Sequence, residues 1–208
     1  MELAHAARYL LVASLAGCAM FASAAGGQQL EGTALVKALQ HGGYVIVMRH
    51  ASSPREAPDQ ASADPENTKL ERQLDKNGRE SSTAFGKALR DLKIPIGEVL
   101  VSPTYRALET ARYAELPNPR PTPELGDNAQ SMQNTTQSQA DWLRKRVAQF
   151  PSGTNTILIT HQPNIASAFP DDANLTDGEA LIFGPGANGG ATVIARVKID
   201  AWPALHGI

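Results

Sequence analysis

The sequence lacks the residues on which several kinds of site depend. Its 208 residues include a single cysteine, Cys18, which excludes an intramolecular disulfide framework, a cysteine-rich zinc site and an iron–sulfur cluster. It also lacks an excess of positive charge, because 21 acidic residues oppose 19 basic ones, and we therefore expect no nucleic-acid partner. With 42% hydrophobic and 19% charged residues in a chain of this length, the composition is typical of one globular domain.

The sequence also lacks an apolar run long enough to cross a membrane, which takes about 20 residues. The uncharged and mostly apolar run Tyr9–Phe21 has only 13 residues. It follows Arg8 and precedes Ala22-Ser23-Ala24, whose small residues are typical of a signal-peptidase cleavage site. We therefore predict a secretory signal over residues 1–24 and a single domain over residues 25–208. A short amphipathic helix is the alternative for the first segment.

A second processing route starts from Leu15-Ala16-Gly17-Cys18, which resembles a bacterial lipoprotein box. In such a box the cysteine is lipid-modified and becomes the first residue. Cleavage after Ala24 is favoured here, because apolar residues continue past Cys18. Both routes predict a periplasmic or exported protein, and a lipid on Cys18 would be its only attachment to a membrane.

Short apolar runs alternate with amphipathic stretches along the rest of the chain. The runs are rich in Val and Ile, as strands buried on both faces of a parallel sheet are, and they cover residues 44–48, 98–102 and 156–160. Helical patterns cover residues 33–40, 77–92, 103–114, 140–150 and 162–169. Two further strands are expected at residues 179–183 and 192–199. The alternation predicts an α/β fold, a three-layer sandwich with a mostly parallel central sheet flanked by helices.

The remaining segments have the composition of loops. Residues 51–73 contain little apolar content, and we place them on the side of the active site. Four prolines exclude a helix interior over residues 117–123, whereas Pro103 suits the first turn of a helix. Residues 128–139 are uncharged and polar, which indicates a surface excursion.

Ionisable residues follow three of the predicted strands directly. Arg49 and His50 follow the first strand, Arg106 lies just after the second, and His161 follows the third. Because ligands of open α/β sheets bind at the carboxyl ends of the strands, these four side chains are expected in one crevice. Two arginines and two histidines would repel one another unless an anion lay between them. Guanidinium groups hold phosphate through paired N–H···O bonds, so the pattern predicts a phosphate site.

The same segments resemble the histidine phosphatase superfamily, whose fold is phosphoglycerate mutase-like. Its first motif is an Arg-His pair after the first strand, here Arg49-His50 followed by Ala51 where the family usually has Gly. Its second motif is Ser-Pro-x-x-Arg-Ala-x-x-Thr-Ala, which the ten residues from Ser102 to Ala111 match throughout, and its third is a histidine after a later strand, here His161. The tail from Asp177 to Pro185 resembles an exported subgroup related to lipopolysaccharide-core heptose phosphatases.

The resemblance implies a two-step phosphoryl transfer without a cofactor or a metal. His50 would attack phosphorus as a neutral imidazole, and Arg49, Arg106 and His161 would hold the phosphoryl oxygens. Metal binding by the two histidines stays open as an alternative, although no third ligand lies at a recognisable spacing. A cysteine-based phosphatase is excluded, because Cys18 leaves with the signal or carries a lipid.

The leaving group needs a proton, so a carboxylic acid with a raised pKa is expected. Family members carry this acid either after the second motif or after the second histidine. We choose Glu179, at the start of a predicted strand, with Asp127 as the alternative and with a solvated turn residue as the other interpretation of Glu179. Asn164 is expected to cap its helix. Loop cations are expected on the surface rather than on the substrate: Arg55, Lys69 and Arg72.

We therefore predict an exported phosphatase whose substrate is a phosphorylated small molecule, such as a sugar phosphate, or a phosphorylated glycan of the cell envelope. A phosphoprotein or phosphohistidine phosphatase is the first alternative. The second is an anion-binding module without catalysis, which would apply if the acid is missing. A mutase is least favoured, because no donor phosphate pool is expected outside the cell.

Overall fold

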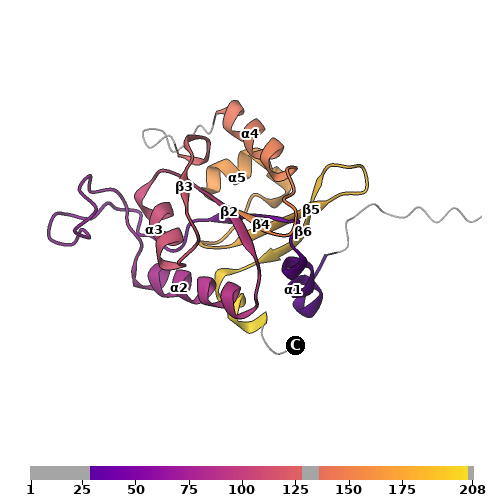
Figure 1. Cartoon of the computed structure of the whole chain (residues 1–208). Helices are drawn as coiled ribbons and strands as arrows, with labels where there is room; N and C mark the ends of the chain where they lie inside the picture. Colours follow the sequence, from indigo (N-terminus) through magenta and orange to yellow (C-terminus); the bar gives the residue numbers. More distant parts are fainter. Residues whose placement is uncertain (1–28, 128–135, 206–208) are drawn as a thin grey trace, which may run out of the picture.

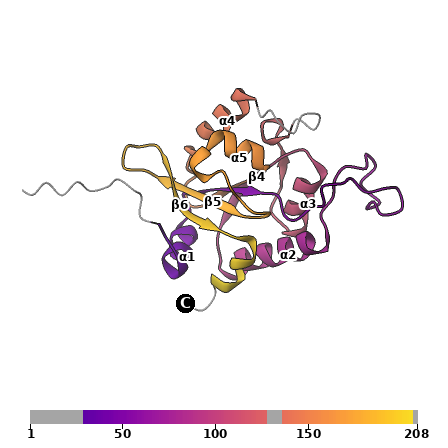
Figure 2. The same cartoon turned by 180° about the vertical axis from the view of Figure 1, so that it is seen from behind.

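The computed structural model describes residues 29–127 and 136–205. The predicted signal segment 1–24, with Cys18, lies outside the described residues, as do residues 128–135 of the expected surface excursion. The described chain folds into one six-stranded sheet with helices on both faces (Figures 1 and 2). This arrangement confirms the predicted α/β sandwich.

The strand order is β3-β2-β4-β1-β5-β6. Strands β1 (Val45–Arg49), β2 (Ile96–Val101), β3 (Arg120–Pro121) and β4 (Asn155–Thr160) are parallel, whereas β5 (Ala180–Pro185) pairs antiparallel with both β1 and β6 (Ala191–Val197). The carboxyl ends of β1, β2 and β4 therefore lie at one edge of the sheet, at the point where the predicted site residues follow.

Helices α1 (Gly32–His41), α2 (Lys76–Asp91) and α3 (Tyr105–Tyr113) cover one face of the sheet. Helices α4 (Gln137–Val147) and α5 (Gln162–Ala168) cover the other face. Four short 3₁₀ turns complete the chain: η1 (Pro123–Leu125), η2 (Pro170–Asp172), η3 (Ile199–Ala201) and η4 (Pro203–Leu205). Within the described ranges, no helix combines the length and apolar character that crossing a membrane would take.

The central strand β1 shows why its sequence is continuously apolar. Successive side chains of a strand point to opposite faces, so Ile46 and Met48 join the core under α1, α2 and α3. Val45 and Val47 join the second core, under α4 and α5. All four side chains are fully buried, and burial of one such side chain contributes about 1.5–3 kcal/mol.

Two helix starts differ from the sequence prediction. Helix α3 begins at Tyr105, so the prediction of Pro103 in its first turn is wrong. The carboxylate of Glu71 accepts a hydrogen bond from the Tyr105 backbone N–H (2.9 Å) and thereby caps α3 from a distant loop. Helix α4 begins at Gln137 rather than 140, because Thr136 and Gln139 form a reciprocal capping box.

Residues 51–74 connect β1 to α2 as a long irregular segment, which we name the excursion loop. It projects from the body of the molecule beside α3 in both views (Figures 1 and 2). Its polar composition is consistent with this exposure, and its last residue, Leu74, returns to the core with 1% of its surface exposed. The loop therefore leaves and re-enters the fold next to the carboxyl end of β1.

Candidate active site

The structure brings His50, Arg106 and His161 together at the carboxyl ends of three neighbouring strands. The side chains are 4%, 6% and 2% exposed, respectively, and the two imidazole ring centroids lie 5.3 Å apart. The sheet fixes both histidines, because the His50 N–H donates to the Thr160 carbonyl at 3.0 Å and His161 follows that residue directly. We name His50, Arg106 and His161 the His–Arg cluster.

His50 presents the lone pair of one ring nitrogen to Arg106. Its Nδ1 lies 2.8 Å from the carbonyl oxygen of Ala51, which only accepts, so Nδ1 carries the ring proton. Its Nε2 is then the acceptor, and the Nε–H of Arg106 donates to it at 3.2 Å. Burial, followed by the nearby His161 and Arg106, lowers the pKa of His50 well below its ordinary value. His50 is therefore a buried, neutral imidazole whose Nε2 lone pair faces Arg106.

His161 is held as a neutral imidazole of the opposite tautomer. Arg106 Nη2 donates to its Nδ1 at 3.0 Å, so its Nε2 carries the proton and donates to the Ser102 hydroxyl at 2.7 Å. Burial, followed by the charges of Arg106 and Arg72, lowers the pKa of His161 well below its ordinary value. An arriving dianion would oppose this shift, because negative charge favours the imidazolium form.

The second sequence motif can now be explained residue by residue. Ser102 orients His161, Arg106 joins the two imidazoles, and Thr110 accepts from the backbone N–H of Ala51 at 3.1 Å. The two alanines of the motif, Ala107 and Ala111, are fully buried in the core under α3. The motif therefore positions both histidines.

Arg49, the last residue of β1, lies beside the cluster and is partly exposed. Its Nη1 donates to the carbonyl of Leu175 at 2.8 Å, and its Nη2 forms an ion pair with Asp177 at 2.6 Å. Its Nε is buried and has no hydrogen-bond partner among the described residues. Arg49, which directly precedes His50, thus keeps its Nε–H without a partner among the described residues.

A backbone hydrogen bond from a glycine connects the segment after α5 to His50. The Gly178 N–H donates to the His50 carbonyl at 2.9 Å, and this residue has φ of +73°. A Cβ at this position would lie 2.8 Å from the side chain of Ile199. Only glycine therefore allows the backbone to approach His50 in this conformation.

The structure places Glu179 in a different environment from the one expected of a general acid. One carboxylate oxygen accepts from Arg196 Nε at 2.5 Å, and the other accepts from the N–H and the hydroxyl of Thr176, both at 2.8 Å. Burial of the carboxyl would raise its pKa, but these donors outweigh burial and lower the pKa. The contacts therefore do not support the predicted role of Glu179 as the acid.

Asp127 contacts the His–Arg cluster directly. Its Oδ2 forms an ion pair with Arg106 and lies 3.8 Å from His161 Nδ1. Its Oδ1 is buried and has no hydrogen-bond partner in the part of the chain that the structure describes. Asn164 supports this position, because its side chain donates to the carbonyl of Gly126 at 3.0 Å. The prediction that Asn164 caps its helix is wrong, since α5 has no side-chain cap.

Arg72 is a residue whose placement the sequence did not reveal. It is half-buried and donates to the carbonyls of Pro54 (2.5 Å) and Ser53 (3.1 Å) at the start of the excursion loop. Its charge contributes to the lowered pKa of His161, and burial followed by the charge of Arg106 lowers its own pKa, so Arg72 interacts electrostatically with the cluster. Arg55 and Lys69 are exposed, as expected.

Nothing in its spacing distinguishes Arg72 from the other loop cations, because the excursion loop has no regular pattern.

Metal binding was the alternative for the two histidines. Across residues 29–127 and 136–205, no three His, Cys, Asp or Glu side chains are arranged to hold a metal ion.

No protein-family model and no curated protein sequence matches the chain. Solved structures do match its shape. The protein histidine phosphatase SixA complexed with tungstate is 20% identical, with a TM-score of 0.54 over 76% of this chain and 97% of that one. The open reading frame Rv3214 from Mycobacterium tuberculosis is 16% identical, with a TM-score of 0.53 over 73% of this chain and 95% of that one.

A phosphoserine phosphatase from Entamoeba histolytica, in complex with phosphoserine, is 10% identical, with a TM-score of 0.50 over 75% of this chain and 97% of that one. At these identities the likeness establishes the fold, which is the histidine phosphatase, phosphoglycerate mutase-like fold.

Proposed function

We propose that the protein is a phosphatase that hydrolyses a phosphomonoester through a phosphohistidine at His50. The observation that carries this proposal is the Nε2 lone pair of a buried, neutral His50, which faces Arg106 and accepts a hydrogen bond from it. A nitrogen nucleophile next to fixed cations is the arrangement that phosphoryl transfer requires.

In the first step, His50 Nε2 attacks phosphorus, a P–N bond forms, and the bond from phosphorus to the leaving oxygen breaks. Arg106, Arg49 and Arg72 stabilise the charge of the phosphoryl oxygens, and His161 becomes a further donor when the bound dianion favours its protonation. These groups are held by backbone carbonyls and by one another, so little reorganisation is needed when substrate binds. The leaving oxygen needs a proton as the bond breaks.

We propose Asp127 as the acid that supplies this proton. In the free protein its carboxylate is paired with Arg106, the cation that a phosphate dianion would also contact. A bound phosphate dianion would compete with Asp127 for Arg106 and so loosen the pairing of the carboxyl group. The unpartnered Oδ1 is then free to donate to the leaving oxygen.

In the second step, water attacks phosphorus and the P–N bond breaks. The Asp127 carboxylate removes a proton from the water, and inorganic phosphate leaves. His50 returns to its neutral form and Asp127 to its protonated form, so that each cycle consumes one water and releases one alcohol and one phosphate.

For the substrate we propose a phosphorylated small molecule, such as a sugar phosphate, or a phosphorylated glycan of the cell envelope. Two sequence features support this choice: the apolar run Tyr9–Phe21 with its cleavage-site residues, and the resemblance of residues 177–185 to an exported subgroup. The proposal includes a periplasmic or exported location, with cleavage after Ala24 as the favoured processing and a lipid on Cys18 as the alternative, which would be the only membrane attachment.

Phosphohistidine in a protein is the second candidate substrate. The similarity in shape to a protein histidine phosphatase, over 97% of that chain, favours it. Export disfavours it, because few phosphohistidine proteins are expected outside the cytoplasm.

The test is hydrolysis of a panel by the purified protein: p-nitrophenyl phosphate, sugar phosphates, lipopolysaccharide fragments and a phosphohistidine protein. We expect turnover of p-nitrophenyl phosphate, loss of turnover in His50→Ala, and preference for one class within the panel. Binding of phosphate without any hydrolysis would instead identify an anion-binding module.

A further inference from the structure

The backbone directly before Asp127 is held by side chains of the neighbouring elements. The hydroxyl of Thr160, the last residue of β4, donates to the carbonyl of Leu125 at 2.8 Å. The side chain of Asn164, in α5, donates to the next carbonyl, that of Gly126, at 3.0 Å. Leu125 is also fully buried in the core under α4 and α5. The peptide that leads into Asp127 is therefore attached to the sheet and to α5 by bonds that do not involve the Asp127 carboxylate.

Two amide side chains bind the Gly126 carbonyl, and Asn164 is the better shielded of them. The other, Gln139 of α4, donates to this carbonyl at 3.1 Å, but it is partly exposed and its own oxygen serves the capping box with Thr136. Asn164 is 2% exposed, and its hydrogen bond to Gly126 is buried. A hydrogen bond in a medium of low dielectric constant is stronger than one in contact with water, so Asn164 restrains Gly126 more strongly than Gln139 does.

Asn164 also connects Asp127 to the second histidine of the site. It lies three residues after His161, in the first turn of α5, so one short piece of backbone carries both side chains. His161 Nδ1 lies 3.8 Å from the Asp127 carboxylate. The hydrogen bond from Asn164 to Gly126 therefore fixes Asp127 relative to His161, beside the place where the phosphoryl group is proposed to bind.

This backbone attachment matters most when the ion pair of Asp127 is loosened. In the free protein the carboxylate is held by Arg106. A bound dianion competes for Arg106 and so weakens that restraint. The hydrogen bond between Asn164 and Gly126 joins two neutral groups, and the dianion has no donor to offer the carbonyl in exchange. Asp127 is then held through its backbone while its carboxyl group is available to the leaving oxygen.

We propose that Asn164 is a positioning residue for the acid, because its hydrogen bond to Gly126 keeps Asp127 within reach of the leaving oxygen once the dianion has engaged Arg106. The inference rests on the proposed role of Asp127 as the acid. A group that transfers a proton acts only within hydrogen-bond reach, and a misplacement of about 1 Å can cost about 10²-fold in rate. Loss of this hydrogen bond should therefore slow the release of poor leaving groups, which need the proton, and spare good ones.

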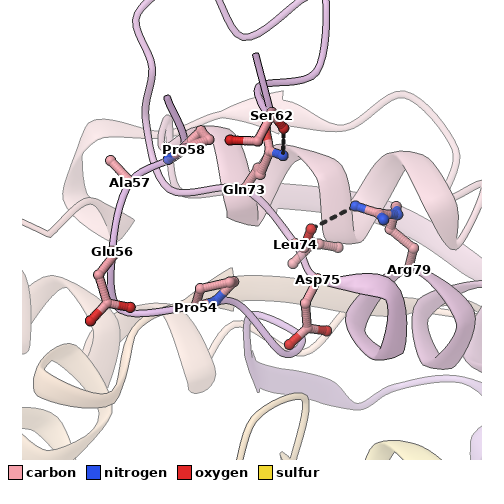
Figure 3. Close-up of a pocket in the computed structure, with 9 residues that line it drawn as sticks. All are labelled: Pro54, Glu56, Ala57, Pro58, Ser62, Gln73, Leu74, Asp75 and Arg79. Carbon is pink, nitrogen blue, oxygen red and sulfur yellow. Dashed lines mark hydrogen bonds between the residues drawn. The ribbon is translucent and has the colours of Figure 1, made fainter. Parts of the chain in front are cut away.

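A matched amide for comparison lies in the excursion loop. Gln73 lines a cavity of about 300 Å³ between this loop and the start of α2, and its side chain donates to the carbonyl of Ser62 at 2.9 Å (Figure 3). Its other hydrogen bonds, with Asp64 and Asn67, also stay within the loop. Gln73 thus joins two chain segments through an amide and a backbone carbonyl, as Asn164 does, but its contacts are not with the segment that carries the acid.

The test compares kcat/KM for two substrates of similar shape, phenyl phosphate and p-nitrophenyl phosphate. Phenol has a pKa of about 10 and needs a proton as it leaves, whereas p-nitrophenolate does not. Asn164→Leu keeps the size of the side chain and removes the donor. We expect it to lower kcat/KM about tenfold for phenyl phosphate and less than about twofold for p-nitrophenyl phosphate. Gln73→Met should keep the wild-type ratio of the two values. An unchanged ratio in Asn164→Leu, including an equal loss on both substrates, overturns the proposal.

A double variant separates positioning of the acid from an independent effect on the site. If Asn164 acts through Asp127, Asn164→Leu should cause no further loss on phenyl phosphate in an Asp127→Asn background. A further loss as large as in the wild-type background overturns the positioning role. If Asp127→Asn itself leaves the ratio unchanged, the acid assignment fails and the proposal fails with it. If Asp127→Asn changes the ratio and Asn164→Leu does not, Asp127 stands as the acid and only the role of Asn164 is wrong.

Gln139→Met gives a second route to the same answer. It removes the other donor to Gly126 at a partly exposed position, so it should change the ratio in the same direction as Asn164→Leu by a smaller factor. If Asn164→Leu does not fold, an unchanged ratio in Gln139→Met overturns the proposal in its place.

Discussion

The two carboxylates considered as the acid, Glu179 and Asp127, differ in what holds them. Glu179, beside β5, is bound by Arg196 and Thr176, whose contacts serve the carboxylate itself. Asp127, after η1, is bound by Arg106, which belongs to the cluster, and keeps one oxygen without a partner. A substrate dianion competes for the partner of Asp127 but not for the partners of Glu179. A bound dianion can therefore change the contacts of Asp127 while it leaves those of Glu179 in place.

Removing the acid gives the largest expected effect. In Asp127→Asn, kcat for a substrate with a poor leaving group, such as a sugar phosphate, should fall about 10²–10⁴-fold, because no proton reaches the leaving oxygen. The fall should be much smaller for p-nitrophenyl phosphate, whose leaving group needs no proton. Glu179→Gln is the matched variant and should keep most of its activity on both substrates. Loss of the sugar phosphate activity in Glu179→Gln alone would return the acid role to Glu179.

Removing the charge of Glu179 should affect the stability of the protein rather than its activity. Glu179→Gln should lower the free energy of unfolding by about 1–2 kcal/mol at neutral pH, because Arg196 loses a charged acceptor. The folded pKa of Glu179 is lowered, so its stabilising contribution is present above the unfolded pKa and is lost as pH falls through the folded pKa. Urea titrations across this acid range should converge for the wild type and the variant. A constant difference at every pH would contradict the ion-pair account.

Arg72 should give the smallest effect of the three. Arg72→Gln should raise KM about five- to tenfold with little change in kcat, because its charge contributes to binding of the dianion in the ground state as well as in the transition state. Arg55→Gln changes an exposed cation of the same loop and serves as the control. Equal kinetics of the two variants would show that Arg72 acts only within the loop.

The parts of the site that follow buried strands were predictable. Arg49, His50, Arg106 and His161 each lie at or after a run of apolar residues, and the sheet register then places the ends of the strands together. The layers and the mostly parallel sheet followed from the same runs. The start of α3 did not follow from them, because Glu71, far away in the sequence, caps Tyr105.

The carboxylates were not predictable in the same way. The sequence shows an acidic residue at Glu179 and at Asp127, but the partners that these carboxylates bind come from β6 and from α3. Glu109 lies inside the recognised motif, yet burial and, after it, Asp64 in a loop without periodicity raise its pKa to about 7. Charge state is a property of the assembled environment, so it becomes readable only when distant segments are placed together.

The central claim is that His50 carries the phosphoryl group between the two steps. Rapid quenching of the protein during turnover of p-nitrophenyl phosphate, followed by mass spectrometry at alkaline pH, tests it directly. The account predicts one phosphoryl group on His50, stable to base and labile to acid, and no phosphorylated protein in His50→Ala. Full turnover by His50→Ala, or a phosphoryl group on another residue, would contradict it.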